Sequence, residues 1–210
     1  RHLNTESDTE ALLNLFAHEL QIQNLEEVTP QSIFDATEKV FNRCSGGYAV
    51  VAMILNHGLV DFRDPNAIRP LVIGVRESNE GKEYMIASES VALDVVGFSL
   101  LRDVLRGEAI FIDTGGNFHS KQCVEPRSYT PCIFEFVYFA RPDAKIDGVL
   151  TYSVRHQIGK KLWDEAPLNA DIVVPVPDSG IACALGFSEA SNIPYREGLI
   201  KNRYVHRSFI

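Results

Sequence analysis

Two different hydrophobic patterns divide this chain near residue 127. In the first part, apolar residues recur at helical spacing over residues 8–20 and 30–41, and Pro30 stands in the first turn of the second segment. Short β-branched runs separated by tight turns come next. They predict a mostly antiparallel sheet with strands over 49–55, 59–62, 70–75, 84–87, 109–113 and 118–122. A short helix over 90–96, with Ser88 or Ser90 as its candidate cap, interrupts them.

In the second part, helices and strands alternate. An amphipathic helix over 151–165 precedes a continuous apolar strand over 171–176, and a helix over 180–190 leads to another strand that starts at Pro194. Alternation of this kind predicts right-handed crossovers and a parallel sheet. The chain is therefore expected to have an α/β (α+β) fold.

The chain is long enough to bury a substantial core. Its 210 residues are 45% hydrophobic, which suits one large domain or parts of two. A linker rich in proline and hydroxyl residues surrounds the change of pattern. We therefore place a domain boundary there and expect two parts, residues 1–127 and 128–210.

The charge and the cysteines exclude several classes of protein. A net charge of −8 argues against nucleic acid as a partner, because binding its backbone needs a basic face, although a local anion site remains compatible. The longest apolar run, over 48–55, is too short to span a bilayer, and no signal peptide opens the chain. The scattered cysteines suit reduced thiols, so a cytoplasmic location is expected: Cys44, Cys123, Cys132 and Cys183.

The most informative local motif is IVVPVPDSG, residues 172–180. It places the Asp178 carboxylate and the Ser179 hydroxyl where a parallel strand ends and a helix begins. Open α/β sheets bind ligands at that edge, and helix amides there favour anions. Ser179 could therefore hold a metal ion or a phosphate oxygen. The pattern is equally compatible with Asp178 or Ser179 acting only as a helix N-cap.

A basic segment, KNRYVHR over residues 201–207, comes after the last predicted strand. It carries three Lys or Arg side chains and one aromatic ring in seven residues of an otherwise acidic chain. Such a segment can fold over a polyphosphate, with Lys as a point charge and Arg as a two-pronged donor. A solvated basic loop is the alternative.

Near the start, the segment Thr5-Glu6-Ser7-Asp8 combines carboxylates with hydroxyls. Such a group could hold the ammonium of a small substrate. From the pattern alone, however, a helix cap is the better supported interpretation.

Six stretches of the chain, in order, resemble one family. They are RHLNTESDTEALLNLFA, FRDPNAIRPLVIG, YMIASESVALDVVGF, CIFEFVYFARPD, VPVPDSG and GLIKNRYVHRSFI, and they cover nearly the whole chain. By these motifs the sequence is similar to the amidophosphoribosyltransferases, enzymes of the first committed step of purine (IMP) biosynthesis. The resemblance implies the last part of an N-terminal-nucleophile (Ntn) hydrolase glutaminase domain, an α-β-β-α sandwich, over 1–127. It implies the opening part of a type I phosphoribosyltransferase domain, built on a parallel sheet, over 128–210.

The resemblance also implies a reaction. In the family, an N-terminal cysteine thiolate attacks the glutamine amide, and the ammonia passes internally to a second site. There it displaces pyrophosphate from C1 of phosphoribosyl diphosphate to give 5-phosphoribosylamine. Asp8 matches the carboxylate that binds the glutamine α-amino group. The residues that match the phosphoribosyl diphosphate site, the last three of them in a mobile loop, are Asp178, Ser179, Lys201, Tyr204 and Arg207.

Cofactors and partners are implied by the same resemblance. A magnesium ion on the pyrophosphate is expected, with Ser179 taking part in its binding. Cys132 matches a ligand of the 4Fe–4S cluster that some members contain, and its three other ligands would lie beyond residue 210. Purine nucleotides are implied as feedback inhibitors, and a homo-oligomer, usually a tetramer, as the full-length assembly. A plant relative would be plastid-targeted.

Several features depart from the family pattern. None of the four cysteines opens the chain, which begins at Arg1 without Met and ends on an apolar tail, so both ends are expected to be cuts through a longer protein. The fragment alone is therefore expected to be inactive. Ala67 and His206 stand where the family usually has Gly, and each would restrict the backbone.

Two other interpretations remain open. A non-catalytic relic of the same fold would bind purine nucleotides as a regulatory protein. A simple phosphoribosyltransferase that uses a purine base is disfavoured, because half of the chain matches the glutaminase domain.

Overall fold

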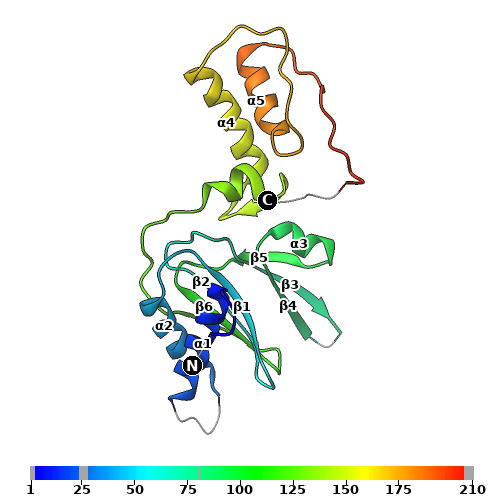
Figure 1. The fold of residues 1–210 in the computed structure, drawn as a ribbon. Helices are drawn as coiled ribbons and strands as arrows, with labels where there is room; N and C mark the ends of the chain where they lie inside the picture. The colour runs from blue at the N-terminus through cyan, green and yellow to red at the C-terminus, as the bar shows by residue number, and fades with distance from the viewer. Residues whose placement is uncertain (1–2, 24–27, 80, 206–210) are drawn as a thin grey trace. The chain divides into compact units, whose positions relative to one another are not determined.

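The computed structural model describes residues 3–23, 28–79 and 81–205 (Figure 1). The chain divides into two compact units, Arg1–Cys132 and Ile133–Ile210. The division falls five residues after the boundary placed at 127, since residues 128 to 132 group with the first unit. Each unit is described by itself.

Two helices open the first unit, as the apolar spacing predicted. Helix α1 (Asp8–Gln21) begins after Ser7, whose side chain accepts a hydrogen bond from the backbone amide of Thr9. Helix α2 (Pro30–Arg43) begins after Thr29, and Thr29 and Ser32 form a reciprocal capping box. Both starts therefore satisfy backbone donors that a helix otherwise leaves free.

Two antiparallel sheets come after the helices. The first has the strand order β1-β2-β6-β7, with bounds Ala49–Ile54, Gly58–Arg63, Glu108–Asp113 and Phe118–Gln122. The second has the order β4-β3-β5, with bounds Gly81–Ala87, Val72–Ser78 and Ser99–Asp103. A short helix, α3 (Ser90–Val95), connects β4 to β5.

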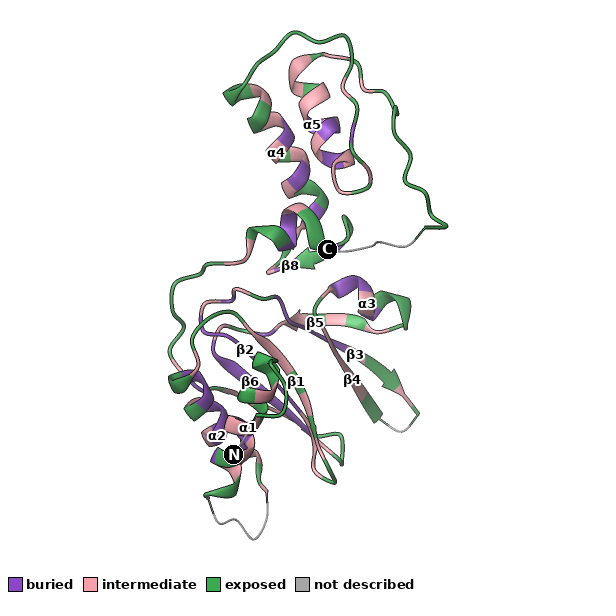
Figure 2. Cartoon of the chain, in the orientation of Figure 1, coloured by how far each residue is buried: buried purple, intermediate pink, exposed green. Residues whose placement is uncertain are grey.

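The first unit has four layers. One face of the first sheet packs against α1 and α2 through a core that includes Phe16, Phe41 and Phe62. Its other face meets the second sheet in a smaller core that includes Ile73 and Ile110. Beyond the second sheet lies α3. Figure 2 shows that burial is concentrated in β2, β6 and one face of α2. The result is the predicted α-β-β-α arrangement.

The second unit is mostly helical. A π-helical turn (Glu135–Phe139) and a two-stranded ribbon, β8 (Lys145–Ile146) with β9 (Val149–Leu150), precede α4 (Thr151–Glu165). Helix α5 (Ile181–Ser191) packs closely against α4. The buried Arg155 of α4 donates hydrogen bonds to the carbonyls of Phe136 and Ala140, which joins the π-helical turn to the helix.

Some sequence predictions were wrong. Strand β5 was missed, because its two consecutive leucines carry no clear alternation. The turn between β3 and β4 is tighter than the predicted strands over 70–75 and 84–87 implied, because the two strands extend to Ser78 and from Gly81. The cap of α3 is Glu89, without a side-chain hydrogen bond, in place of Ser88 or Ser90.

The predicted strand over 171–176 is also shorter than expected. It is represented by a single parallel bridge between Val173 and Tyr195, and Ile172 and Val176 are exposed. A central parallel strand is buried on both faces. In the described part of the chain, the pairing of this segment is limited to residues 194–196, so it lacks the layers that would bury it.

Candidate functional site

The ends of two parallel segments meet at one place in the second unit. The amide of Val173 donates to the carbonyl of Pro194, and the amide of Arg196 donates to the carbonyl of Val173, both at 2.9 Å. The two segments therefore run in the same direction. The Pro-Asp-Ser-Gly turn continues the first segment and the basic residues continue the second, so both leave the same edge.

The turn over residues 177–180 leads directly into α5. The carbonyl of Asp178 accepts from the amide of Ile181, and the N-cap position belongs to Gly180, which makes no side-chain cap. Asp178 and Ser179 are therefore not the N-cap that the alternative interpretation required. Asp178 is exposed and Ser179 is partly buried, so both are available at the start of the helix.

A cation from the basic segment reaches this turn. The Lys201 ammonium lies 3.3 Å from the Asp178 carboxylate, and both side chains are more than half exposed. Two motifs 23 residues apart are thus brought together by strand register. The described site is an exposed turn that combines a carboxylate, a hydroxyl, the start of a helix and one cation.

The rest of the basic segment is only partly described. Tyr204 is 96% exposed, and its backbone amide donates to the Asn202 side chain at 3.0 Å. Arg207 and His206 lie outside the described residues. The structure therefore places Lys201 beside the turn and leaves Tyr204 exposed to solvent.

Asp8 lies in the first unit, at the first position of α1, and its side chain is exposed. The neighbouring Glu10 carboxylate accepts hydrogen bonds from the backbone amides of Asn4 and Thr5 and from the Thr5 hydroxyl. These hydrogen bonds lower the pKa of Glu10, the Thr5 hydroxyl having the largest effect. The chain before α1 is thereby folded back onto the helix, and Asp8 remains outside these contacts.

The sequence DPNAIRP, residues 64–70, forms a turn around the buried Asp64. The Asp64 carboxylate accepts from the backbone amides of Tyr48, Asn66, Ile68 and Arg69, and the residue is fully buried. Ala67 adopts a positive φ of 53° within this turn. A side chain there is strained by about 1–2 kcal/mol relative to glycine. This departure from the family pattern therefore carries a structural cost.

The same turn holds the segment that contains Cys132. The amides of Arg127, Thr130 and Cys132 donate to the carbonyls of Pro65, Asn66 and Ile68. Cys132 is partly buried and is a free thiol. These hydrogen bonds explain why residues 128 to 132 group with the first unit, although the sequence pattern assigned them to the second.

A buried carboxylate that sequence reasoning missed is Asp61 of β2. It is fully enclosed, and neither of its oxygens has a hydrogen-bond partner among the described residues. Burial, with a smaller contribution from nearby Glu108, raises its pKa to about 8, and Arg102 opposes this rise. Alternation along β2 could have placed Asp61 on the face between the two sheets, where a carboxylate has no access to water.

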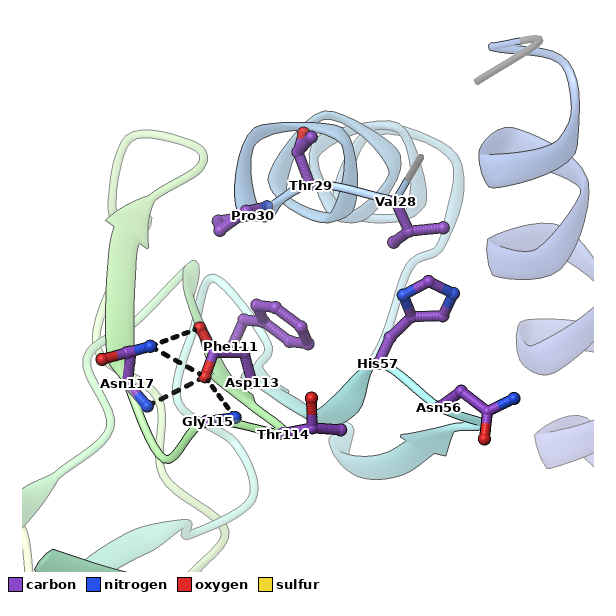
Figure 3. A pocket seen from close by; sticks show the side chains of 10 residues that line it. All are labelled: Val28, Thr29, Pro30, Asn56, His57, Phe111, Asp113, Thr114, Gly115 and Asn117. Atoms are coloured by element: carbon purple, nitrogen blue, oxygen red, sulfur yellow. Dashed lines mark hydrogen bonds between the residues drawn. The ribbon is translucent and has the colours of Figure 1, made fainter. Parts of the chain in front are cut away.

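A cavity of about 480 Å³ lies at the hairpin ends of the first sheet (Figure 3). It is lined by the start of α2, by the turn at His57 and by the turn from Asp113 to Asn117. The Asp113 carboxylate already accepts from Gly115, Asn117 and His119, which lowers its pKa to about 2, the His119 hydrogen bond being the main cause. The lining of this cavity includes no site residue predicted from the sequence.

The described residues contain neither a preformed metal cluster nor a membrane helix. Across residues 3–23, 28–79 and 81–205, no three His, Cys, Asp or Glu side chains come together as metal ligands would. Within the same ranges, no helix has both the length and the hydrophobicity that crossing a bilayer requires.

Comparisons with known proteins give a consistent result. No protein-family model matches the chain. Over its whole length it is similar to proteins named amidophosphoribosyltransferase: 52% identical to that of Pseudomonas aeruginosa, 48% to that of Escherichia coli and 46% to that of Saccharomyces cerevisiae. It spans 43% of the length of each of these relatives.

Solved structures agree with the sequence comparison. The chain matches the structure described as the allosteric regulatory enzyme of purine biosynthesis with a TM-score of 0.82 and 38% identity, over 100% of this chain and 42% of the other. It matches glutamine phosphoribosylpyrophosphate amidotransferase from B. subtilis, complexed with ADP and GMP, with the same score and identity, over 100% of this chain and 43% of the other. By sequence and by fold, the chain belongs to the amidophosphoribosyltransferase family, of whose curated members it spans less than half.

Proposed function

We propose that the protein to which these residues belong is a glutamine-dependent amidophosphoribosyltransferase. It converts glutamine, phosphoribosyl diphosphate and water into 5-phosphoribosylamine, glutamate and diphosphate. The observation that carries this proposal is the meeting of the Asp178–Ser179 turn with Lys201 at one strand edge, in a chain 52% identical to a protein of that name. In this proposal the first unit ends the glutaminase domain and the second begins the phosphoribosyltransferase domain.

Each site residue has a role that suits its chemistry. The Ser179 hydroxyl, at the start of α5, is suited to donate to a diphosphate oxygen, and the amides of the helix start favour the same charge. Lys201 supplies a positive charge at the same edge. Tyr204 and Arg207 would cover the ligand, which would keep water from competing with ammonia. In the first unit, the exposed Asp8 carboxylate would pair with the α-ammonium of glutamine.

The residues at the strand edge also fit a magnesium ion. Mg²⁺ prefers oxygen ligands and usually takes only one or two from the protein, with phosphate oxygens and waters completing its shell. Ser179 offers one such oxygen, and Asp178 beside it offers a carboxylate. A bound Mg²⁺ would neutralise charge on the leaving diphosphate.

The chain supplies one predicted ligand of an iron–sulfur cluster. A 4Fe–4S cluster requires four cysteine thiolates. Around Cys132, the described residues form no group of three potential ligands. Cys132 therefore remains a single predicted ligand, and no step of the reaction is assigned to a cluster.

Regulation and assembly extend the proposal. One of the similar solved structures was determined with ADP and GMP. We propose that purine nucleotides inhibit this protein at the diphosphate site, because their phosphates suit the same helix start and cation. We also propose that the full-length protein forms a homo-oligomer, a tetramer. Its proposed location is the cytoplasm, or a plastid if the protein comes from a plant.

The test uses the longer protein that contains these residues. We expect pyrophosphate release that requires phosphoribosyl diphosphate, Mg²⁺ and either glutamine or ammonia. Loss of one hydrogen bond to a charged group costs about 1.5–3 kcal/mol, so Ser179→Ala should raise the KM for phosphoribosyl diphosphate about tenfold to a hundredfold. Glu77→Gln, an exposed change in the first unit, is the control.

Two outcomes would contradict this proposal. The absence of glutamine- and ammonia-dependent pyrophosphate release would exclude the amidotransferase reaction. Tight binding of purine nucleotides without any turnover would instead support the non-catalytic regulatory interpretation.

A further inference from the structure

In the structure of the chain alone, the cation proposed for the diphosphate site is paired with a carboxylate. Lys201 lies 3.3 Å from Asp178, which belongs to the turn that precedes α5. The contact results from strand register. Val173 pairs in parallel with Tyr195, so residues a few positions further along the two segments lie at the same edge.

The packing of the two segments supports this register beyond the single bridge. A side chain on Gly198 would come within 2.9 Å of Val174, so the segments remain in close contact beyond Tyr195. Asp178 lies five positions after Val173, and Lys201 lies six positions after Tyr195, so the ion pair continues the contact between the two segments that the bridge begins.

The Asp178 carboxylate is the anionic partner of Lys201 in this structure. Both side chains are about 60% exposed. An exposed ion pair of this kind is weak, so it can open without disturbing the fold. A diphosphate carries more negative charge than one carboxylate and should therefore compete with Asp178 for Lys201.

We propose that Asp178 is a positioning residue that holds Lys201 at the strand edge as an internal counter-anion, which a diphosphate must displace. The inference rests on the proposed function, since it assigns this edge to a diphosphate-bearing ligand. It adds a source of specificity. Anions with little charge compete poorly with Asp178, whereas a diphosphate gains Lys201 and the start of α5 together.

The experiment measures binding of inorganic pyrophosphate to the 210-residue chain by calorimetry, at low salt and without divalent metal. Removing the competing carboxylate in Asp178→Asn should tighten the dissociation constant about two- to fivefold, the range that an exposed ion pair allows. Lys201→Gln should weaken binding. In the double variant the gain from Asp178→Asn should vanish, because no cation is left to release.

Three further measurements separate this role from a merely structural one. Asp178→Glu, which keeps the charge, should bind as the unaltered chain does. The gain in Asp178→Asn should shrink as salt is raised, since screening weakens exposed pairs. Asp164→Asn removes a comparable exposed carboxylate, paired with Lys161 on α4, and should leave pyrophosphate binding unchanged.

The proposal is overturned if Asp178→Asn binds pyrophosphate no more tightly than the unaltered chain. It is equally overturned if the gain persists in the double variant. These outcomes are independent of turnover. Failure of the longer protein to release pyrophosphate from phosphoribosyl diphosphate would remove the proposed function and leave the measured competition intact.

Discussion

Asp61 is fully enclosed between the two sheets of the first unit, and its pKa of about 8 lies far above the ordinary value of 3.8. Burial is the main cause, Glu108 adds to it, and Arg102, which pairs with Glu108, counteracts it. Between about pH 4 and pH 8 the folded chain therefore holds a proton that the unfolded chain releases. The stability linked to this proton is fully present below about pH 4 and is lost as the pH rises through about 8.

From this linkage we predict that Asp61→Asn makes the first unit less sensitive to pH. Between about pH 5 and pH 8 the unaltered chain should lose up to about 1.4 kcal/mol of unfolding free energy per pH unit through this residue. The variant should lose less, so the difference between the two should grow with pH. Hydrogen exchange of the amides in β2 and β6 measures this difference. Glu77→Gln, at an exposed carboxyl, is the control, and parallel pH profiles for Asp61→Asn and the unaltered chain would contradict the prediction.

Helices α4 and α5 approach each other through two glycines. A Cβ added at Gly186 would lie 1.9 Å from the carbonyl oxygen of His156, and one added at Gly159 would lie 1.9 Å from that of Cys183. Both obstacles are backbone atoms, which cannot move aside without separating the helices. The close approach also brings Trp163 edge-on to Phe187, with ring centroids 5.6 Å apart.

The close packing of α4 and α5 predicts an effect on stability that is opposite in sign to the effect that helix propensity alone predicts. Propensity alone would make Gly186→Ala stabilising by about 1 kcal/mol. Because the helices must separate, we expect it to be destabilising by about 1–3 kcal/mol or more. Trp163 is the chain's single tryptophan, so its fluorescence during urea unfolding reports this unit. Ser153→Ala, at an exposed position of α4, should leave the midpoint nearly unchanged, and a raised midpoint for Gly186→Ala would contradict the prediction.

Elements with strong periodicity were predictable from the sequence. Both N-terminal helices, the β1–β2 and β6–β7 hairpins, α4 and α5 occur where apolar spacing and turn residues placed them. Strand β5 was not predictable in the same way, because it depends on pairing with β3 across a register irregularity near Gly74. The segment over 171–176 has the apolar pattern of a strand, but whether it forms strand hydrogen bonds depends on the segments that lie beside it in space.

The two motifs that form the candidate site were recognisable in the sequence, whereas the contact between them was not. The sequence identified the Pro-Asp-Ser-Gly turn and the basic segment separately, as two motifs that each follow a predicted strand. The pairing of Lys201 with Asp178 depends on a register that only tertiary structure sets. The backbone hydrogen bonds to Asp64, likewise, depend on amides brought together by a folded turn.

At the scale of the whole molecule, the two units divide the proposed chemistry. Asp8, the residue proposed to bind glutamine, belongs to the first unit. The strand edge with Asp178, Ser179 and Lys201, proposed to bind the diphosphate, belongs to the second. Three of the four cysteines are poorly suited to the thiolate chemistry of a glutaminase. Burial raises the pKa of Cys44, Cys123 and Cys183, that of Cys123 to about 12.

These thiols lead to a prediction about the 210-residue chain by itself. A glutaminase needs a thiolate as its nucleophile, and raised pKa values keep buried cysteines protonated at neutral pH. The purified chain should therefore release no glutamate from glutamine above the rate in buffer. An enzymatic glutamate assay measures this, with the longer protein as the positive control. Glutamate release by the shorter chain that disappears after alkylation of its cysteines would show that one of them is a competent nucleophile, contrary to this expectation.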